Sequence, residues 1–237
     1  MKGEIRCGYA TNVGCLRDHN EDAYSVEPEL GLWVVADGMG GHEGGEIASE
    51  ITITTVSQAI RAGRTLKEAF AEAHAAVKDA GASGVGKTGM GSTVVALRIN
   101  DNDYEIAWVG DSRIYLWDGK EFRQISHDHS YVQLLVDNQL IEKNDVRSHP
   151  MKHIVNQAIG NCANDDVDVD TLAGRLVEGC RFLLCSDGLS DELTDEEIAS
   201  VICSKAMVQE AVDRLIDMAL DSGGSDNITA MVVELAG

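Results

Sequence analysis

The stretch LWVVADG, residues 32–38, carries the pattern that decides the fold. Its apolar run is rich in β-branched and aromatic residues, which favour a strand, and it stops at an Asp-Gly pair. Apolar runs that lead into an aspartate return in IAWVGD at 106–111 and in LLCSDG at 183–188. The sequence therefore predicts three strands that run into Asp37, Asp111 and Asp187.

A fourth aspartate, Asp226, stands immediately before another expected strand. In an antiparallel sheet the start of one strand lies beside the end of its neighbour, so Asp226 is expected to meet the other three. Glu21 and Asp22 follow a turn-like segment and are candidates to join them. Taken singly, each Asp-Gly pair is more simply a turn signal. Metal ligation and a capping role are equally open for Asp22, Asp111 and Asp191.

Carboxylates gathered this closely repel one another unless protons or cations lie between them. Ligation by oxygen alone, with no Cys or His in the same motifs, suits Mg²⁺ or Mn²⁺ better than Zn²⁺. Gly38 lets the backbone come close, so its carbonyl is a further candidate ligand. The expected cofactor is therefore Mn²⁺ or Mg²⁺.

Strand-like and helix-like stretches alternate in groups along the whole chain. The expected strands cover 5–10, 32–36, 93–99, 104–109, 113–117, 182–185 and 228–235. Short links at 100–103 and 118–120 predict antiparallel hairpins. Helices are expected at 46–61, 65–80, 129–140, 194–202 and 207–220, two of them opening with capping boxes at 65–68 and 194–197. This order favours an α+β fold of antiparallel sheets covered by helices.

Length and composition fit one domain over residues 1–237. The chain has 40 Asp and Glu against 19 Lys and Arg, a net charge of −21, so it lacks the basic footprint of a nucleic-acid binder. No apolar run reaches membrane-spanning length, and the N-terminus has no apolar signal region. We expect a soluble, cytoplasmic protein with no membrane partner. Its six cysteines form no Cys-x-x-Cys pair and are expected to be small core residues.

Six short motifs follow one another along the chain. They read GCLRDHNED (14–22), DGMGGH (37–42), GMGST (89–93), GDSR (110–113), SDGLSD (186–191) and DNIT (226–229). In this order they resemble the motifs of the type-2C metal-dependent Ser/Thr protein phosphatases, and DGMGGH resembles the bacterial form. The resemblance covers nearly the whole chain.

This resemblance implies a four-layer αββα sandwich, in which two antiparallel β-sheets are flanked by helices and two metal ions lie at one end. The ligands that it implies, with the bridging residue first, are Asp37, Gly38 through its carbonyl, Asp187, Asp226, and Glu21 or Asp22 acting largely through water. Bacterial members hold a third, weaker ion on residues that match Asp111 and Asp191. Residues 127–160 would form the flap, a substrate-selecting insertion beside the site.

The resemblance also assigns roles in phosphate transfer. Arg17 stands where the family binds the substrate phosphate, and a guanidinium can clamp phosphate oxygens bidentately. Two-metal chemistry implies in-line attack of water on phosphorus. Animal members carry a proton-donating His after Asp-Gly, where this chain has Met39, as bacterial members do. His42 is therefore the candidate proton donor to the leaving alkoxide, with His19 and a water molecule as alternatives.

Two further stretches match other motifs formally. GASGVGKT at 81–88 fits the P-loop pattern, but a P-loop needs a strand before it and a helix after it. The expected order here is the reverse, which excludes a P-loop fold. DVDVD at 166–170 lacks the Gly and the Glu of a calcium loop and predicts a strand with one acidic face.

Other functional classes fit parts of the sequence. A pseudophosphatase would keep the fold as a phosphoprotein-binding module, but Asp37, Asp187 and Asp226 are all present, which favours catalysis. A two-metal phosphodiesterase would mix His with Asp in its ligand motifs. The sequence thus predicts a protein Ser/Thr phosphatase that hydrolyses phosphothreonine and phosphoserine. Its expected partners are phosphorylated proteins, including a Ser/Thr kinase and the substrates of that kinase, and the chain is expected to be a monomer.

Overall fold

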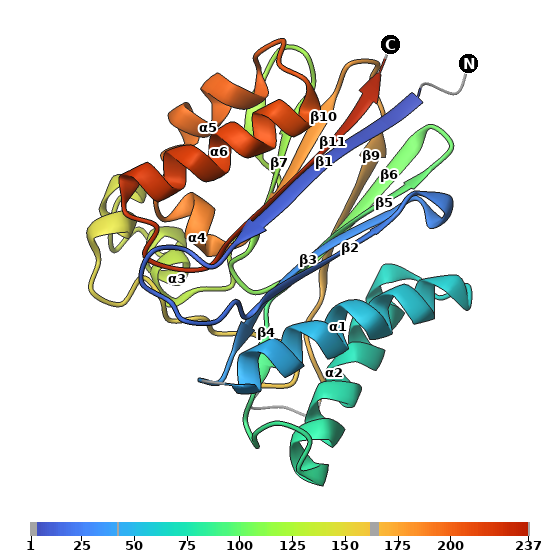
Figure 1. Cartoon of the computed structure of the whole chain (residues 1–237), viewed down its shortest axis with the longest axis vertical. Coiled ribbons are helices and arrows are strands. Elements are labelled where there is room, and N and C mark those ends of the chain that lie inside the picture. The colour runs from blue at the N-terminus through green and yellow to red at the C-terminus, as the bar shows by residue number, and fades with distance from the viewer. Residues whose placement is uncertain (1–3, 42, 162–165, 237) are drawn as a thin grey trace.

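The computed structural model describes residues 4–41, 43–161 and 166–236. Over these ranges the strands form two antiparallel sheets (Figure 1). The first has the order β1-β11-β10-β7-β8, from β1 (Glu4–Asn12), β11 (Ile228–Ala236), β10 (Arg181–Cys185), β7 (Arg113–Trp117) and β8 (Phe122–Gln124). The second has the order β2-β3-β5-β6-β9, from β2 (Asp22–Glu27), β3 (Leu32–Met39), β5 (Val94–Asn100), β6 (Asp103–Val109) and β9 (Asp170–Arg175), and β4 (Gly91–Ser92) pairs with β3.

Helices cover the outer face of each sheet (Figure 1). The second sheet is covered by α1 (Glu43–Arg61) and α2 (Leu66–Ser83). The first is covered by α4 (Asp187–Ser190), α5 (Asp195–Ile202) and α6 (Val208–Ser222). Both predicted capping boxes are present, at the starts of α2 and α5. The predicted α+β fold, a four-layer αββα sandwich, is therefore confirmed.

The opening stretch of β3 explains why the sheets stack. Successive side chains of a strand point to opposite faces. Trp33 and Val35 lie in the apolar cluster between the sheets, and Val34 lies in the cluster under α1 and α2. A strand buried on both faces needs an unbroken apolar run. That run carries Asp37 to the end of the sandwich.

The predicted hairpins are confirmed, whereas the strand expected at 166–170 is wrong. β5 and β6 are joined through Asp101 and Asn102, and β7 and β8 through a turn that begins at Asp118. Only Asp170 of the run at 166–170 is in a strand, because the pairing of β9 with β6 stops one residue before β6 ends. Val169 is nevertheless buried and Asp168 exposed, so the alternation of Val and Asp in this run predicted correctly which of these side chains is buried.

The flap contains α3 (Tyr131–Asp137) and the 3-10 helix η2 (Lys143–Ser148). The helix expected at 129–140 is shorter than predicted, because Ser130 caps its start and Gln139 adopts a positive φ of 57° after its end. The cysteine expectation is also wrong in part: Cys15 is exposed, and Cys162 lies outside the described residues. None of the helices in the described ranges is long and apolar enough to cross a lipid bilayer.

Candidate metal centre

The strand ends that carry the predicted acids meet at one end of the sandwich. Asp37, near the end of β3, pairs in register with Asp22 at the start of β2. Asp187 follows β10, and Asp226 precedes β11, the antiparallel neighbour of β10. Asp111 follows β6. The antiparallel pairing therefore brings together acids as far apart in the sequence as Asp22 and Asp226.

A cavity of about 790 Å³ opens at this end of the molecule. Predicted site residues line it: Arg17, Glu21, Asp37, Gly38, Asp111, Asp187 and Asp226. The flap contributes His153, Ile154 and Val155 to the same lining. The cavity thus has acidic walls on the side of the sheets and a partly apolar wall on the side of the flap.

Two glycines let the acid-bearing segments approach one another. A Cβ on Gly38 would lie 2.0 Å from the Gly45 carbonyl oxygen, and a Cβ on Gly188 would lie 2.0 Å from the Asn227 carbonyl oxygen. Such separations are far inside van der Waals contact, so no side chain fits at either position. The Asp-Gly pairs therefore serve close packing of the backbone beside the acids.

The electrostatics of the acids reflect their crowding. Burial raises the pKa of Asp37 well above its ordinary value, and repulsion by Asp22 and Asp187 raises it further. Burial likewise raises the pKa of Asp187, with Asp111 and Asp191 as the largest repelling neighbours. Groups in this state bind protons or cations readily, because either one relieves the repulsion.

Asp22 lies beneath the cavity and is buried. The hydroxyls of Ser186 and Thr229 donate to its Oδ2 at 2.7 and 2.6 Å, while its Oδ1 has no hydrogen-bond partner among the described residues. Burial raises the pKa of Asp22 to about 6, and the two hydroxyls oppose that shift. A buried carboxylate oxygen without a donor is a position where a cation or its water shell relieves an unfavourable state.

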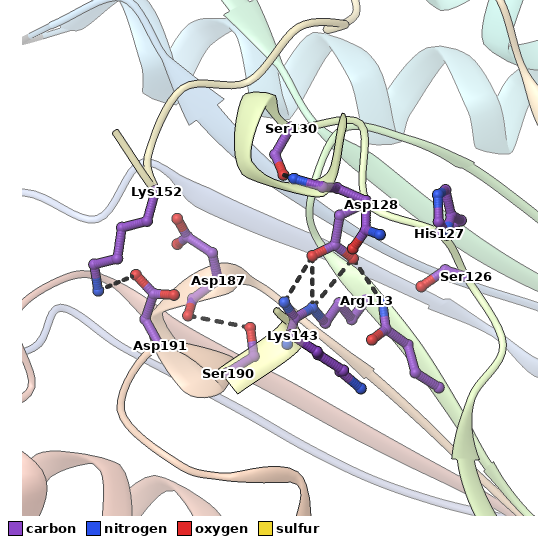
Figure 2. A network of polar contacts seen from close by, with 12 residues as sticks. Arg113, Ser126, His127, Asp128, Ser130, Lys143, Lys152, Asp187, Ser190 and Asp191 are labelled. Carbon is purple, nitrogen blue, oxygen red and sulfur yellow. Dashed lines mark hydrogen bonds and ion pairs between the residues drawn. The ribbon is translucent and has the colours of Figure 1, made fainter. Parts of the chain in front are cut away.

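Asp111 is the other buried acid with a large shift. Burial and the nearby Asp128 raise its pKa to about 7, and Arg113 opposes the shift. Arg113 is itself held by Asp128 through hydrogen bonds of 2.7–3.1 Å (Figure 2). Because Arg113 is bound to Asp128, no cationic side chain among the described residues pairs directly with Asp111.

These donors fit divalent cations that prefer oxygen ligands. The acids lining the cavity are crowded, partly or fully buried and hard to ionise together, and they offer carboxylate oxygens with the Gly38 backbone beside them. Mg²⁺ and Mn²⁺ favour such ligands.

Arg17 lies at the rim of the cavity and is half-exposed. Its Nη2 donates to Asp226 Oδ2 at 2.6 Å, and this hydrogen bond raises the pKa of Arg17 above its ordinary value. The loop that carries Arg17 is fixed by Asn227, whose side chain accepts from the Glu21 amide and donates to the carbonyls of Val13 and His19. Asn227, like Ser186 and Thr229, was not singled out from the sequence.

Asp191 lies at the end of α4, close to both Asp187 and the flap residue Lys152 (Figure 2). Lys152 Nζ lies 2.8 Å from Asp191 Oδ2, and the Arg147 guanidinium donates to the Asp191 carbonyl at 2.7 Å. His153, Asp187 and Asp191 each place one ligand atom within 4.8 Å of the others. The predicted third-ion residue is therefore shared between the acid cluster and the flap.

The remaining candidates are two histidines and the P-loop-like stretch. His42 is outside the described residues, and His19 is exposed in the Arg17 loop. Lys87, from the P-loop-like stretch, donates to the Gly41 carbonyl at 2.9 Å. The stretch covers the end of α2 and precedes β4, so the order of elements contradicts a P-loop, as the sequence predicted.

Comparison with known proteins agrees with this geometry. The model of the family described as protein phosphatase 2C matches residues 17–231. The chain is 34% identical to the serine/threonine phosphatase stp of Listeria monocytogenes, over 95% of this chain and 94% of that protein. The crystal structure of the Mycobacterium tuberculosis serine/threonine phosphatase PstP/Ppp superposes with a TM-score of 0.86 at 35% identity, covering 98% of this chain and 99% of that one. The PstP catalytic domain in complex with two manganese ions gives a TM-score of 0.85 at 32% identity, covering 98% and 99%. The chain therefore belongs to the protein phosphatase 2C family of serine/threonine protein phosphatases.

Proposed function

We propose that this chain hydrolyses phosphoserine and phosphothreonine in proteins with two Mn²⁺ or Mg²⁺ ions held in the acidic cavity. The observation that carries the proposal is the convergence of Asp37, Asp187 and Asp226 from separate strands on one cavity that also contains Arg17. The two manganese ions in the related PstP structure support the number of ions.

The ligand assignment follows the sequence prediction. Asp37, the Gly38 carbonyl, Asp187 and Asp226 would hold the two ions, and Glu21 or Asp22 would contribute largely through water. When bound, the ions supply positive charge for the phosphate dianion and lower the pKa of the attacking water. They also reverse the local sign of a chain with net charge −21, which would otherwise repel its substrate.

The protein's own groups position the substrate. Arg17 uses one Nη to hold Asp226 and keeps further N–H donors for phosphate oxygens at the cavity rim. Ser186 and Thr229 fix Asp22, and Asn227 fixes the loop before Glu21. Because these groups are already hydrogen-bonded, the carboxylates need little rearrangement when substrate arrives.

The substrates are proposed to be phosphoproteins of a Ser/Thr kinase pathway, with the kinase itself among them. The apolar flap residues Ile154 and Val155 line the cavity opposite the acids. They suit the residues that flank a phosphorylated side chain better than they suit a small polar phosphate ester. His42 is the proposed proton donor to the serine or threonine alkoxide.

Phosphate release from a phosphothreonine peptide tests the proposal. The wild type should turn over with Mn²⁺ and stop with a chelator. Asp187→Asn should lower kcat/KM by at least about 100-fold, because it removes a charged ligand. Asp217→Asn, an exposed acid on α6, is the matched control and should behave as wild type.

Asp187→Asn also separates catalysis from folding. The pKa of Asp187 is raised in the metal-free protein, so a neutral side chain of the same shape should not lower metal-free stability. A wild type that binds phosphopeptide but releases no phosphate with any divalent ion would mark a pseudophosphatase and reject the enzyme.

A further inference from the structure

The cationic side chains of the flap all contact one short stretch of the chain, residues 191–195. Residues 127–160 contain three Lys and Arg residues, Lys143, Arg147 and Lys152. Lys143 pairs with Asp195 Oδ2 at 2.9 Å, and the other two contact Asp191. All three therefore hold the flap against the stretch from the end of α4 to the start of α5, and Figure 2 shows the contact between Lys152 and Asp191.

Lys152 has the most informative position. Its ammonium lies 2.8 Å from Asp191 Oδ2, and both side chains are about three-quarters buried, at 24% and 25% exposure. His153 Nδ1 lies 3.5 Å from the same oxygen. The backbone of Asp191 is held as well, because Arg147 donates to its carbonyl. The flap thus covers one side of the Asp191 carboxylate.

The same carboxylate is one of the two that the family resemblance implies for a weak third ion, with Asp111. A divalent cation on Asp191 would share its carboxylate with an ammonium at hydrogen-bond distance. Like charges that close repel strongly where water is partly excluded. One of the two cations must therefore leave before the other binds with full strength.

We propose that Lys152 is the resident cation of Asp191 and competes with a third divalent ion for it, so that docking of the flap and occupancy of the third site exclude each other. This goes beyond the proposed function, which needs only the two ions on Asp37, Asp187 and Asp226. It gives a physical reason for weak third-site binding, since the ion must displace a built-in cation.

The competition connects metal binding to the cavity wall. Ile154 lies two residues after Lys152 and lines the active-site cavity. When a third ion displaces Lys152, the flap loses one of its three cationic contacts, and the wall beside the acids is freed to move. The free concentration of divalent ion therefore controls how firmly the flap covers the site.

Counting bound Mn²⁺ tests this directly. Free Mn²⁺ is measured by electron paramagnetic resonance during titration of the wild type, Lys152→Met, Lys152→Arg and Lys143→Met. Lys152→Met keeps the apolar stem and removes the charge, so its third site should tighten by about tenfold or more. Lys152→Arg keeps the charge, and Lys143→Met removes a flap cation that touches Asp195 instead, so both should match the wild type.

A second measurement uses the unmodified chain. Hydrogen exchange over residues 141–160 should stay slow while the two tight sites fill and should rise only over the Mn²⁺ range in which the third ion binds. Equal third-site affinity in wild type and Lys152→Met would overturn the proposal, as would flap exchange that does not respond to the third ion. Absence of any tight site in the wild type would contradict the proposed function and this proposal together, whereas two tight sites with an unaltered third overturn this proposal alone.

Discussion

At the scale of single residues, His42 is proposed to protonate the leaving alkoxide. An alkoxide from serine or threonine is a poor leaving group and needs a proton, whereas an aryl oxide does not. His42→Ala should therefore lower kcat on a phosphothreonine peptide by roughly 10- to 100-fold and leave an aryl phosphate nearly unchanged. Arg17→Ala, which affects phosphate binding, should lower kcat/KM for both substrates. Equal small effects of His42→Ala on the two substrates would remove it from the mechanism.

Thr229 permits a test of how Asp22 is positioned. Thr229→Val keeps the side-chain shape and removes the hydroxyl that donates to Asp22 Oδ2 at 2.6 Å. The pKa of Asp22 should rise above about 6, and Mn²⁺ affinity at pH 7 should fall by about tenfold, measured by calorimetry. Thr11→Val removes the other partner of the Thr229 hydroxyl without touching Asp22 and is the control. Similar losses in both variants would point to general loosening of β1 and β11.

Residues such as these show where prediction from sequence stops. Asp37 and Asp187 could be predicted because each follows an apolar run, and Asp226 because it directly precedes one. Ser186 and Thr229 lie inside two of the quoted motifs, but nothing local links them to Asp22, which is 164 and 207 positions away in the chain. The pairing of Lys152 with Asp191 was hidden for the same reason. Contacts made only by tertiary packing leave no local pattern.

At the scale of elements, the turn from β10 into α4 brings Asp187 to Asp226. Gly188→Ala would place a Cβ 2.0 Å from the Asn227 carbonyl, so β11 or α4 must shift. Overpacking of this kind destabilises by about 1–3 kcal/mol, which should lower Tm by roughly 2–10 °C. Tight Mn²⁺ binding should weaken in the same variant, as seen by calorimetry.

Gly44→Ala is the matched control for that substitution. Gly44 lies in α1, and an added Cβ would make only ordinary contacts of 3.6 Å. Alanine favours a helix over glycine, so Tm should stay level or rise slightly. Unaltered stability and metal binding in Gly188→Ala would mean that the close approach of α4 and β11 is not needed.

Two strands that the sequence missed or misplaced lie at sheet edges. β2 and β9 are the two edges of the second sheet. Edge strands are covered on fewer sides, so their side chains are half-buried or exposed and lack the apolar run that marks β3. The bounds of the central strands and of the capped helices were predicted within a few residues. Burial on both faces and capping residues both leave a pattern in the local sequence.

For the whole molecule, the crowded acids predict an unusual dependence of stability on pH. The pKa values of Asp22 and Asp111 are about 6 and about 7 in the folded metal-free chain, above the ordinary 3.8. Between about pH 4 and 7 the folded state therefore binds more protons than the unfolded state, and stability falls as pH rises. Metal-free protein should melt roughly 5–10 °C lower at pH 8 than at pH 5.5.

Thermal melts with a chelator and with excess Mn²⁺ check this behaviour. Stabilisation by Mn²⁺ should be largest at pH 8, where protons no longer compete for the carboxylates. Asp111→Asn removes one of the titrating groups and should flatten the metal-free dependence. A metal-free Tm that rises between pH 5.5 and 8 would contradict the raised pKa values.

The position of β11 between β1 and β10 has a consequence for how the protein comes into being. A ribosome releases β11 after every other described strand, and Asp226 emerges with it. Until β11 inserts between its two neighbours, Arg17 lacks its acidic partner and the acid cluster lacks one of its members. The growing chain therefore lacks a complete active site until β11 is in place. Catalytic activity is expected to appear in this single late folding step and not gradually during synthesis.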